Sequence, residues 1–367
     1  MEPIRILHVI ENFSLNNGVN SVVMNYYNHI DRSRFIFDFI VHEPVPEENI
    51  ERFRKNGSRV YIMPQLRVKN LVAYIIKLAR FFIIHKEYRI IHGHLPNAAF
   101  LYLGIARLFR IPVRIVHSHN EISADTFLKK VRNNILNLLI PLAANQYAAC
   151  SRNSAKYLFG KRGESAFLLN NAIDTGKFSY SHDTRIRIRK ELNISEEQLV
   201  IGHVGRFCPQ KNHAFIIDVF FEVCSILPDS RLILIGDGEL FTAIERKVNS
   251  LDLSNKVVLV GVSDRVNEYL QAMDIFILPS LFEGFPVSAV EAQMSGLVCY
   301  LSDNINPQVS FSDKTYFLNI KEPASAWAQK IIHCNNARER RTVYDPRFDI
   351  KVQAKRLEDY YLHLYHY

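Results

Sequence analysis

Paired cysteines and long apolar runs are both missing from this 367-residue sequence. The five cysteines stand at long, irregular intervals without a Cys-x-x-Cys pair, so neither a disulfide framework nor a zinc site is indicated. Charged or polar residues interrupt every apolar run before the roughly 18 residues that span a bilayer, and residues 1–5 lack the basic-then-apolar order of a signal peptide. We therefore expect a reducing, cytoplasmic compartment.

An extreme composition is also absent. Hydrophobic residues make up 48% and charged residues 22% of the chain, values that disfavour disorder, collagen and coiled coils. At roughly 100 to 200 residues per domain, the length predicts two domains of about 180 residues each. Two domains imply a cleft between them.

The positive charge is confined to one half of the chain. Residues 1–180 hold 24 Lys+Arg against 13 Asp+Glu, or +11, which leaves 21 against 24, or −3, for residues 181–367. Between Arg67 and Arg132, basic residues are interleaved with an apolar stripe at helical spacing, formed by Leu71, Tyr74, Ile75, Leu78, Phe81 and Phe82. Such a helix either lies on an anionic membrane surface or packs its stripe on its own domain. The two interpretations are compatible if different faces are used.

Strand-length apolar runs alternate with helical patterns along the first half. The predicted strands lie at residues 4–10, 35–41, 59–63, 90–92, 113–117, 146–150 and 166–170, and the predicted helices at 19–30, 70–86 and 97–109. This alternation is typical of a mostly parallel sheet covered by helices on both faces. We expect an N-terminal domain over residues 1–180.

A turn-rich, highly charged stretch at residues 174–189 is the expected linker. The alternation then resumes, with strands at 199–204, 231–235, 257–260, 275–279 and 297–301 and helices at 214–227, 240–250, 266–272 and 286–295. It predicts a second α/β domain over residues 190–345. A last helical pattern predicts a C-terminal helix, and we expect residues 350–367 to pack back on the N-terminal domain.

Ligands of parallel sheets bind beyond the carboxyl ends of the strands, where loops and helix N-termini converge. The first such loop ends in Asn17-Gly18, where a glycine lets backbone N–H groups approach an anion, although a plain turn glycine is the alternative. The loop after strand 199–204 sets Arg206 and Lys211 five residues apart, and both cations suit phosphate oxygens. Solvated surface charges are the alternative there.

A later strand-to-helix loop carries the strongest signal. Glu283 stands just before it, and the backbone groups of Gly284, Phe285 and Val287 can face an anion where the next helix begins. Glu291 lies on or beside the apolar stripe of that helix, where a carboxylate is costly to bury unless a ribose or sugar diol donates to it. The alternative is that Glu291 caps or pairs locally.

Two histidine pairs, His92/His94 and His117/His119, follow strands of the first domain and are expected at the same rim. We expect the two rings of each His-x-His pair to point to opposite faces, and no carboxylate at ligand spacing accompanies them. No metal site is therefore predicted. The segment at residues 236–239 lacks the third glycine of a dinucleotide-binding fingerprint, so NAD is not expected.

Taken together, these residues resemble the retaining nucleotide-sugar glycosyltransferases of the two-Rossmann (GT-B) fold, family 4 type, and among them the bacterial exopolysaccharide and capsule enzymes. The resemblance is carried by strand-Gly-Arg-x4-Lys-Asn, by Gly-Asp-Gly, and by Pro-Ser-x2-Glu-Gly-Phe-Pro with a second Glu eight positions after the first. It is strongest over residues 199–302 and continues more weakly through the N-terminal half. It implies two Rossmann-like, doubly wound parallel-sheet domains facing a cleft.

The resemblance also implies a role for each motif residue. Arg206 and Lys211 hold the donor diphosphate as it departs, and they are implied to act in catalysis together with Glu283 and His119. Glu283 and the backbone that follows it bind the transferred sugar. Glu291 takes the ribose hydroxyls.

The remaining implied contacts come from three places. Gly18 approaches the diphosphate from the N-terminal domain, Val262 lies near the base, and His119 contacts the donor sugar. Family members often have two adjacent glycines in the first loop, where this sequence has Asn17 before Gly18.

The implied activity is transfer of a hexose or N-acetylhexosamine from a UDP-sugar to a saccharide acceptor that is lipid-linked, with retention at the anomeric centre and without metal or other cofactor. We expect the enzyme to be peripheral at the inner face of the cell membrane, against an anionic surface, with no nucleic-acid partner. A nucleotide-sugar 2-epimerase of similar fold is the enzymatic alternative, and it would act on the donor alone. A basic membrane- or polyanion-binding module is the non-enzymatic alternative.

Overall fold

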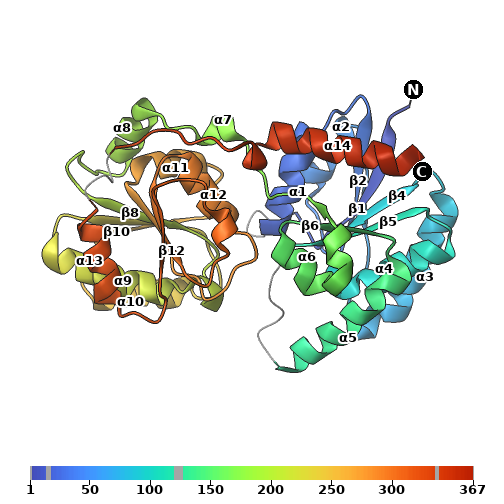
Figure 1. Ribbon diagram of the computed structural model, residues 1–367, viewed down its shortest axis with the longest axis horizontal. Helices are drawn as coiled ribbons and strands as arrows, with labels where there is room; N and C mark the ends of the chain where they lie inside the picture. The colour runs from blue at the N-terminus through green and yellow to red at the C-terminus, as the bar shows by residue number, and fades with distance from the viewer. Residues whose placement is uncertain (1, 14–17, 120–126, 335–338, 367) are drawn as a thin grey trace. The chain divides into compact units, whose positions relative to one another are not determined.

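The computed structural model describes residues 2–13, 18–119, 127–334 and 339–366 of the chain, which form two compact units (Figure 1). Unit 1 comprises Met1–Ala172 and Ile350–Tyr367, and unit 2 comprises Ile173–Asp349. Each unit is built around a parallel sheet of its own.

Unit 1 contains a seven-stranded sheet in the order β3-β2-β1-β4-β5-β6-β7. The strands are β1 (Ile4–Val9), β2 (Phe35–Val41), β3 (Val60–Ile62), β4 (Ile90–Gly93), β5 (Val113–Ser118), β6 (Gln146–Ala149) and β7 (Phe167–Leu168). The helices are α1 (Gly18–His29), α2 (Glu47–Lys55), α3 (Leu71–Ile84), α4 (Pro96–Leu108), α5 (Phe127–Ala143), α6 (Arg152–Phe159) and α14 (Ile350–His366). All strand pairs are parallel, as the alternation of strands and helices predicts.

Helices cover both faces of this sheet, which is why its central strands are nearly continuous apolar runs. Leu7 and Val9 of β1 point to one face and join the core formed with α3, α4 and α6. Side chains that alternate with them point to the other face, where α14 packs beside α1 (Figure 1). Tyr361 of α14 is fully buried there.

Unit 2 contains a six-stranded parallel sheet in the order β10-β9-β8-β11-β12-β13. The strands are β8 (Val200–Val204), β9 (Arg231–Ile235), β10 (Val257–Gly261), β11 (Ile275–Leu278), β12 (Val298–Ser302) and β13 (Thr315–Leu318). The helices are α7 (Thr175–Phe178), α8 (His182–Glu191), α9 (His213–Ile226), α10 (Phe241–Ser250), α11 (Val266–Ala272), α12 (Val287–Met294) and α13 (Ala324–Ile332).

The stretch predicted to be a turn-rich linker is instead mostly helical, because α7 and α8 lie within it. The reason is a buried ionic contact. Arg185 and Arg189, one turn apart on α8, reach the two carboxylate oxygens of Asp274 at 2.7 and 2.8 Å. Asp274 is fully buried, so the charges that suggested an exposed turn fix the helix against the end of the sheet.

No helix among the described residues is both long and apolar enough to cross a membrane.

Candidate functional site

The order of strands reverses direction between β8 and β11 of unit 2. From β8, the strands β9 and β10 are added on one side of the sheet and β11, β12 and β13 on the other. The loops that follow β8 and β11 therefore flank a topological switch point, where open α/β sheets bind ligands. Both loops are those that the sequence singled out. The backbone N–H of Leu281 donates to the Gln210 carbonyl at 2.9 Å, so the two loops touch directly.

Lys211 and Glu283 meet at this point. The Lys211 Nζ lies 2.6 Å from Glu283 Oε1, and the two side chains are only 15% and 7% exposed. The other carboxylate oxygen of Glu283 accepts from Gln210 Nε2 at 3.2 Å. Two predicted catalytic residues are therefore brought together, and Gln210, which sequence reasoning missed, orients the carboxylate of one of them.

A left-handed residue shapes the loop that carries Lys211. Asn212 has φ 57° and ψ 43°, a conformation that asparagine tolerates better than most residues. Its side-chain amide donates to the Pro279 carbonyl at 3.3 Å. Asn212 therefore ends the short turn after Lys211 and ties it to the end of β11.

Arg206 takes a different position from Lys211. It is exposed, and its Nη2 lies 3.0 Å from Glu239 Oε2. Exposed pairs of this kind contribute on the order of 0 to 1 kcal/mol, so an anion with two or more charges can displace Glu239. Arg206 and Lys211 do not contact each other through any hydrogen bond between described atoms.

The Gly-Asp-Gly segment supports the Arg206 loop. Gly236 and Gly238 have φ of +135° and +158°, and a Cβ at either position would lie within 2.5 Å of the carbonyl oxygen of Gly205 or Phe207. The Phe207 N–H donates to the Asp237 carbonyl at 3.0 Å. These glycines are needed so that the two loops can approach each other closely, which is a different use from a dinucleotide fingerprint.

The N-terminus of α12 carries the remaining predicted donor-binding residues of unit 2. Pro286 is the N-cap, and this fully described helix has no acidic side chain in its first turn. Val287 and Gly284 are partly buried, whereas the Phe285 ring is buried and lies 5.5 Å from the Phe348 ring. The first turn can therefore receive an anion at its backbone N–H groups.

Glu291 lies further along α12 and is partly buried. Burial raises the pKa of its carboxyl to about 7, because the charged form loses its hydration. No side-chain hydrogen bond joins Glu291 to another described residue, and the alternative of a local cap or ion pair is not seen among them. Val262, at the loop after β10, is exposed.

Two buried histidines underlie the Lys211 loop and were not singled out from the sequence. The His213 ring stacks on Phe207 at 4.0 Å, and His203 Nδ1 lies 2.9 Å from the Ile277 carbonyl. Burial lowers the pKa of both rings, so both are neutral at pH 7.

The switch point of unit 1 lies between β1 and β4, and the described candidate residues of this unit follow β1 and β5, the strand next to β4. Gly18 is the first residue of α1 and is exposed, with no described atom within 4 Å of the place where a Cβ would stand. Asn17 lies outside the described residues. His119 follows β5, and its side chain is buried.

The expected geometry of the histidine pairs was wrong. The His92 and His94 rings stack with centroids 4.4 Å apart, and those of His117 and His119 stack at 4.0 Å. Residues i and i+2 of a strand share one face, so each pair points the same way. His94, His117 and His119 each place a nitrogen within 4.8 Å of the others, as do His8, His92 and His94.

Comparison with known proteins identifies the family. Residues 184–346 match the family described as "Glycosyl transferases group 1". The chain is 32% identical to the putative glycosyltransferase EpsF of Bacillus subtilis (strain 168) over 334 residues, which cover 89% of this chain and 86% of the relative. The chain belongs to the group 1 glycosyltransferases.

Two further similarities place this glycosyltransferase among enzymes and structures of the same kind. It is 27% identical over 315 residues to an Escherichia coli protein named UDP-Gal:alpha-D-GlcNAc-diphosphoundecaprenol alpha-1,3-galactosyltransferase, covering 83% of this chain and 80% of that one. Its fold matches the crystal structure of Anabaena Alr3699/HepE in complex with UDP and glucose, with a TM-score of 0.80, 17% identity and coverage of 98% and 99%. The predicted GT-B fold of two parallel-sheet α/β domains is confirmed.

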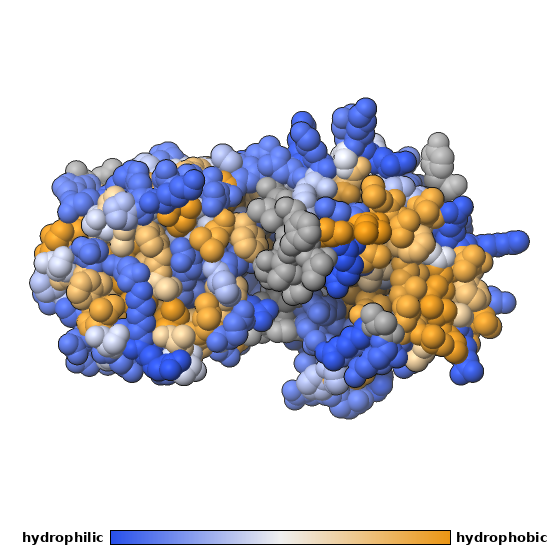
Figure 2. Space-filling view, turned by 90° about the horizontal axis from the view of Figure 1, so that it is seen from below, coloured by the Kyte–Doolittle hydropathy of each residue, from blue (hydrophilic) through white to orange (hydrophobic). Residues whose placement is uncertain are grey.

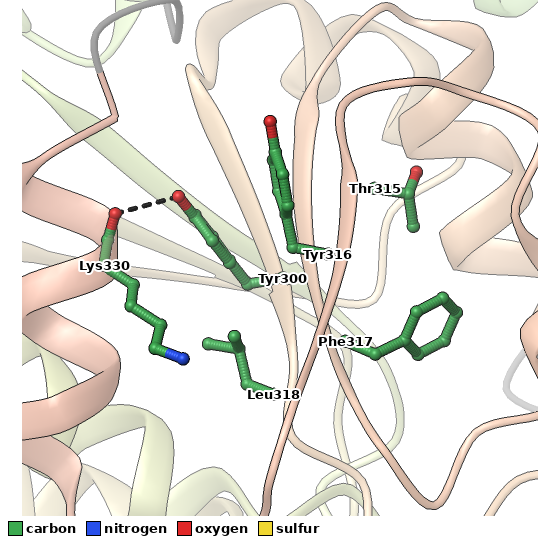
Figure 3. Close-up of a pocket in the computed structure, with 6 residues that line it drawn as sticks. All are labelled: Tyr300, Thr315, Tyr316, Phe317, Leu318 and Lys330. Atoms are coloured by element: carbon green, nitrogen blue, oxygen red, sulfur yellow. Dashed lines mark hydrogen bonds between the residues drawn. The ribbon is translucent and has the colours of Figure 1, made fainter.

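A separate open pocket of the glycosyltransferase lies at the edge of the unit 2 sheet, between the strands β12 and β13 and the helix α13 (Figure 3). Its lining residues are Tyr300, Thr315, Tyr316, Phe317, Leu318 and Lys330. The Tyr300 hydroxyl donates to the Lys330 carbonyl at 2.9 Å, as the dashed line in Figure 3 marks. The pocket contains none of the predicted site residues and lies on the opposite side of β11 from β8, so we assign it no part in sugar transfer.

Proposed function

We propose that this glycosyltransferase moves a hexose or N-acetylhexosamine from a UDP-sugar to a lipid-linked saccharide in polysaccharide biosynthesis, with retention at the anomeric centre. The observation that carries the proposal is the contact between Lys211 and Glu283 at the switch point of unit 2. It sets a cation for the diphosphate beside a carboxylate for sugar hydroxyls. The UDP and glucose in the Anabaena structure, and the donor and acceptor in the name of the E. coli relative, support this choice of substrates.

The cations of the site act where charge develops as the bond to the leaving diphosphate breaks. Lys211 has three N–H donors, so it can keep its bond to Glu283 and still donate to a phosphate oxygen. Arg206 joins it once the phosphate displaces Glu239. Because these side chains supply positive charge themselves, we propose that turnover needs no metal.

The two glutamates divide the donor between them. Glu283, held between Lys211 and Gln210, presents its carboxylate to the hydroxyls of the transferred sugar. Glu291 receives the ribose hydroxyls, which donate to a carboxylate that is otherwise partly buried without a side-chain partner among the described residues. The leaving phosphate accepts the proton of the acceptor hydroxyl.

Residues outside these loops complete the donor contacts in the proposal. The start of α1 at Gly18 offers backbone N–H groups to the diphosphate. Val262, which is exposed, offers an apolar surface to the base. His119 contacts the transferred sugar from unit 1.

A product assay tests the proposal. The protein is incubated with UDP-, GDP- and ADP-hexoses, with and without a diphosphoundecaprenol-linked saccharide and with and without a chelator. We expect product from a UDP-hexose only when acceptor is present, unchanged by chelator, and with retained anomeric configuration by NMR. Conversion of the donor without acceptor would instead identify an epimerase, and turnover that stops with chelator would overturn the metal-independent mechanism.

The surface of unit 1 supports a membrane partner in the same proposal. On α3, four residues of the predicted apolar stripe, Tyr74, Leu78, Phe81 and Phe82, are buried in the domain core, as the packing alternative expects, whereas the other two are exposed. The rest of the helix and its neighbours expose large apolar side chains, namely Leu71, Val72, Ile75, Ile76, Ile83 and Ile84 of α3, Leu108 of α4, and Val131, Ile135, Leu138 and Leu142 of α5. We call this set the apolar surface of unit 1.

Cations accompany the apolar surface of unit 1. Lys77 and Arg80 of α3 are exposed beside it. Figure 2 shows hydrophobic atoms gathered on this face of unit 1, with hydrophilic atoms beside them. An exposed apolar surface with adjacent cations fits an anionic membrane, where a lipid-linked acceptor resides.

A further inference from the structure

Six buried side chains of unit 1 form one hydrogen-bonded chain across the face of the sheet. Its first half contains three histidines from three places. His119 Nε2 lies 2.9 Å from His94 Nδ1, and His94 Nε2 lies 3.0 Å from His8 Nδ1. His8 belongs to β1, while His94 and His119 follow β4 and β5.

The second half returns through the C-terminal helix. The hydroxyl of Tyr361 on α14 lies 3.5 Å from His8 Nε2 and 2.6 Å from His92 Nδ1. His92 Nε2 lies 3.0 Å from His117 Nδ1. The order of the chain is therefore His119, His94, His8, Tyr361, His92 and His117, and we call it the histidine chain.

All five histidines of the histidine chain are neutral at pH 7. Burial lowers the pKa of His8 and His119 to about 3 and the pKa of His92, His94 and His117 well below the ordinary value. A neutral imidazole has one N–H and one bare nitrogen, so each ring donates on one side and accepts on the other.

Only two arrangements bond every link of the histidine chain and also give the Tyr361 hydroxyl proton an acceptor, because a Tyr361 oxygen that accepted from both His8 and His92 would leave that proton without one among the described residues. Each ring uses its Nδ1 toward one neighbour and its Nε2 toward the other, in the same sense along the chain. If one ring carries its proton on Nε2, all five must do so, and the Tyr361 hydroxyl then donates to His92. If one ring carries it on Nδ1, all five do, and the hydroxyl donates to His8.

The two terminal nitrogens of the histidine chain differ between its two tautomeric states. His119 Nδ1 and His117 Nε2 are both buried and have no hydrogen-bond partner among the described residues. In the all-Nε2 state His119 Nδ1 is an acceptor, and in the all-Nδ1 state it is a donor. His119 is also the residue that the proposed function sets against the transferred sugar.

We propose that the histidine chain is a two-state relay of coupled tautomers that sets whether His119 accepts from, or donates to, the transferred sugar, with Tyr361 as the positioning residue at its centre. A sugar hydroxyl that donates to His119 Nδ1 selects the all-Nε2 state through its differential affinity. This inference rests on the proposed function for the identity of the ligand. The coupling of the tautomers itself does not.

Histidine tautomers are measured directly by long-range proton–nitrogen NMR on the full chain labelled with ¹⁵N-histidine. In the unliganded protein and with UDP and glucose added, we expect the five rings to share one tautomer in each condition. Different tautomers within the chain would overturn the relay. A stoichiometric transition metal in protein purified without chelator would also overturn the relay. The same histidine nitrogens include two groups of three that lie within 4.8 Å of one another, and a metal held there would replace the hydrogen bonds of the histidine chain.

Tyr361→Phe tests the centre of the chain, and Tyr360→Phe is its matched control. Tyr360 is the preceding residue of α14; its ring stacks on Phe167 at 4.0 Å, and its hydroxyl has no hydrogen bond to a described residue. In Tyr361→Phe we expect His92 and His117 to take tautomers independent of the other three rings. We also expect kcat to fall about tenfold while the KM for the donor changes less than twofold. Tyr360→Phe should match the wild type in both measurements.

The two measurements separate the relay from the proposed function. If the wild type transfers no sugar, the proposed function fails, but the tautomer spectra still decide whether the chain is coupled. If the spectra show one coupled chain and Tyr361→Phe keeps the wild-type kcat, the chain has no part in transfer and the relay role is wrong.

Discussion

The switch point of unit 2 is lined by charged side chains from two adjacent loops, whereas that of unit 1 is lined by neutral histidines from three strands. Both sheets have the same strand order around that point. In unit 2, Lys211 and Glu283 are largely buried beyond the carboxyl ends of the central strands β8 and β11, where they form an ion pair. In unit 1, burial removes the charge from five rings and leaves tautomers as the variable. The same strand order thus carries different chemistry in the two units, an ion pair in unit 2 and a hydrogen-bonded set of neutral rings in unit 1.

The largest effect expected from this difference is on acid stability. In unit 1 the pKa of six described histidines is lowered, namely His8, His42, His92, His94, His117 and His119, against two in unit 2, His203 and His213. Below pH 6.5 these histidines bind protons in the unfolded chain but stay neutral in the native state. Their contribution to the free energy of unfolding is therefore present above pH 6.5 and is lost as pH falls. Each such histidine contributes a loss on the order of 1 kcal/mol between pH 7 and 5.5.

Hydrogen exchange followed by mass spectrometry measures this comparison unit by unit. On acidification, peptides from unit 1 should lose protection at a higher pH than peptides from unit 2. The exposed His363 provides a control, since His363→Gln should leave the profile unchanged. Equal loss of protection in both units at the same pH would contradict the assignment of the acid sensitivity to buried histidines.

The next effect concerns the charged switch point. Lys211→Ala should lower the initial rate of transfer by about 10²-fold or more, the scale for removing a preorganised charge contact to a transition state. Lys247→Ala is the matched control, because Lys247 also pairs with a carboxylate, Asp218 at 2.6 Å, but on the outer helices of the same unit. A folded Lys211→Ala protein with wild-type turnover would remove Lys211 from the mechanism.

The two glutamates of unit 2 give a smaller and more discriminating effect. Glu291→Ala should weaken UDP itself by about tenfold, since it removes a contact to a part common to all donors. Glu283→Gln should leave UDP affinity within about twofold while transfer falls, because its contact strengthens as the sugar gains positive character. Calorimetric titration with UDP beside rate measurements separates them. Equal loss of UDP affinity in both variants would show that the proposed division of the donor is wrong.

The candidate site of unit 2 could be proposed from the sequence because its residues lie in short, local motifs. Arg206 and Lys211 stand in one loop, and Glu283 and Glu291 flank one helix start, so loop position indicated anion binding, while their separate roles came from the resemblance to the glycosyltransferase family. The contact between Lys211 and Glu283 was not predicted, since 72 residues separate them and the contact needs β8 and β11 to be neighbours. Gln210 was missed for the same reason.

The histidine chain of unit 1 could not be predicted from local motifs in the same way. Tyr361 lies 269 residues from His92, and nothing in the local sequence of α14 marks its hydroxyl as a partner of a ring on β4. The histidine pairs themselves were found, but their rings were expected on opposite faces of an extended chain. Only the sheet register, which sets His8 opposite His92, shows that the rings form one group.

The fold was predicted best where apolar runs are continuous. β2, β9 and α11 have the predicted bounds, and most other strands differ by one or two residues. Helices α2, α5, α6, α7, α8 and α13 were missed, as was strand β13. α5 contains Pro141 within it, and α8 owes its stability to a buried Asp274 that is distant in sequence, so local pattern alone could not identify either helix.

The smallest expected effect returns to the surface on which the two units differ. Exposed apolar side chains of α3 stand beside Lys77 and Arg80 in the basic half of the chain, whereas residues 181–367 carry a net charge of −3. Val72→Ser/Ile84→Ser should reduce sedimentation with anionic vesicles by about threefold, because it removes part of the apolar area that enters the interface. Ile226→Ser, at an exposed apolar position of unit 2, should change nothing. Raising the salt should weaken wild-type binding as well, since exposed charges are screened beyond about 8 Å at physiological ionic strength. If the protein sediments equally with neutral and anionic vesicles, the cations have no part in binding. If Ile226→Ser loses as much binding as the double variant, the membrane does not distinguish the two units.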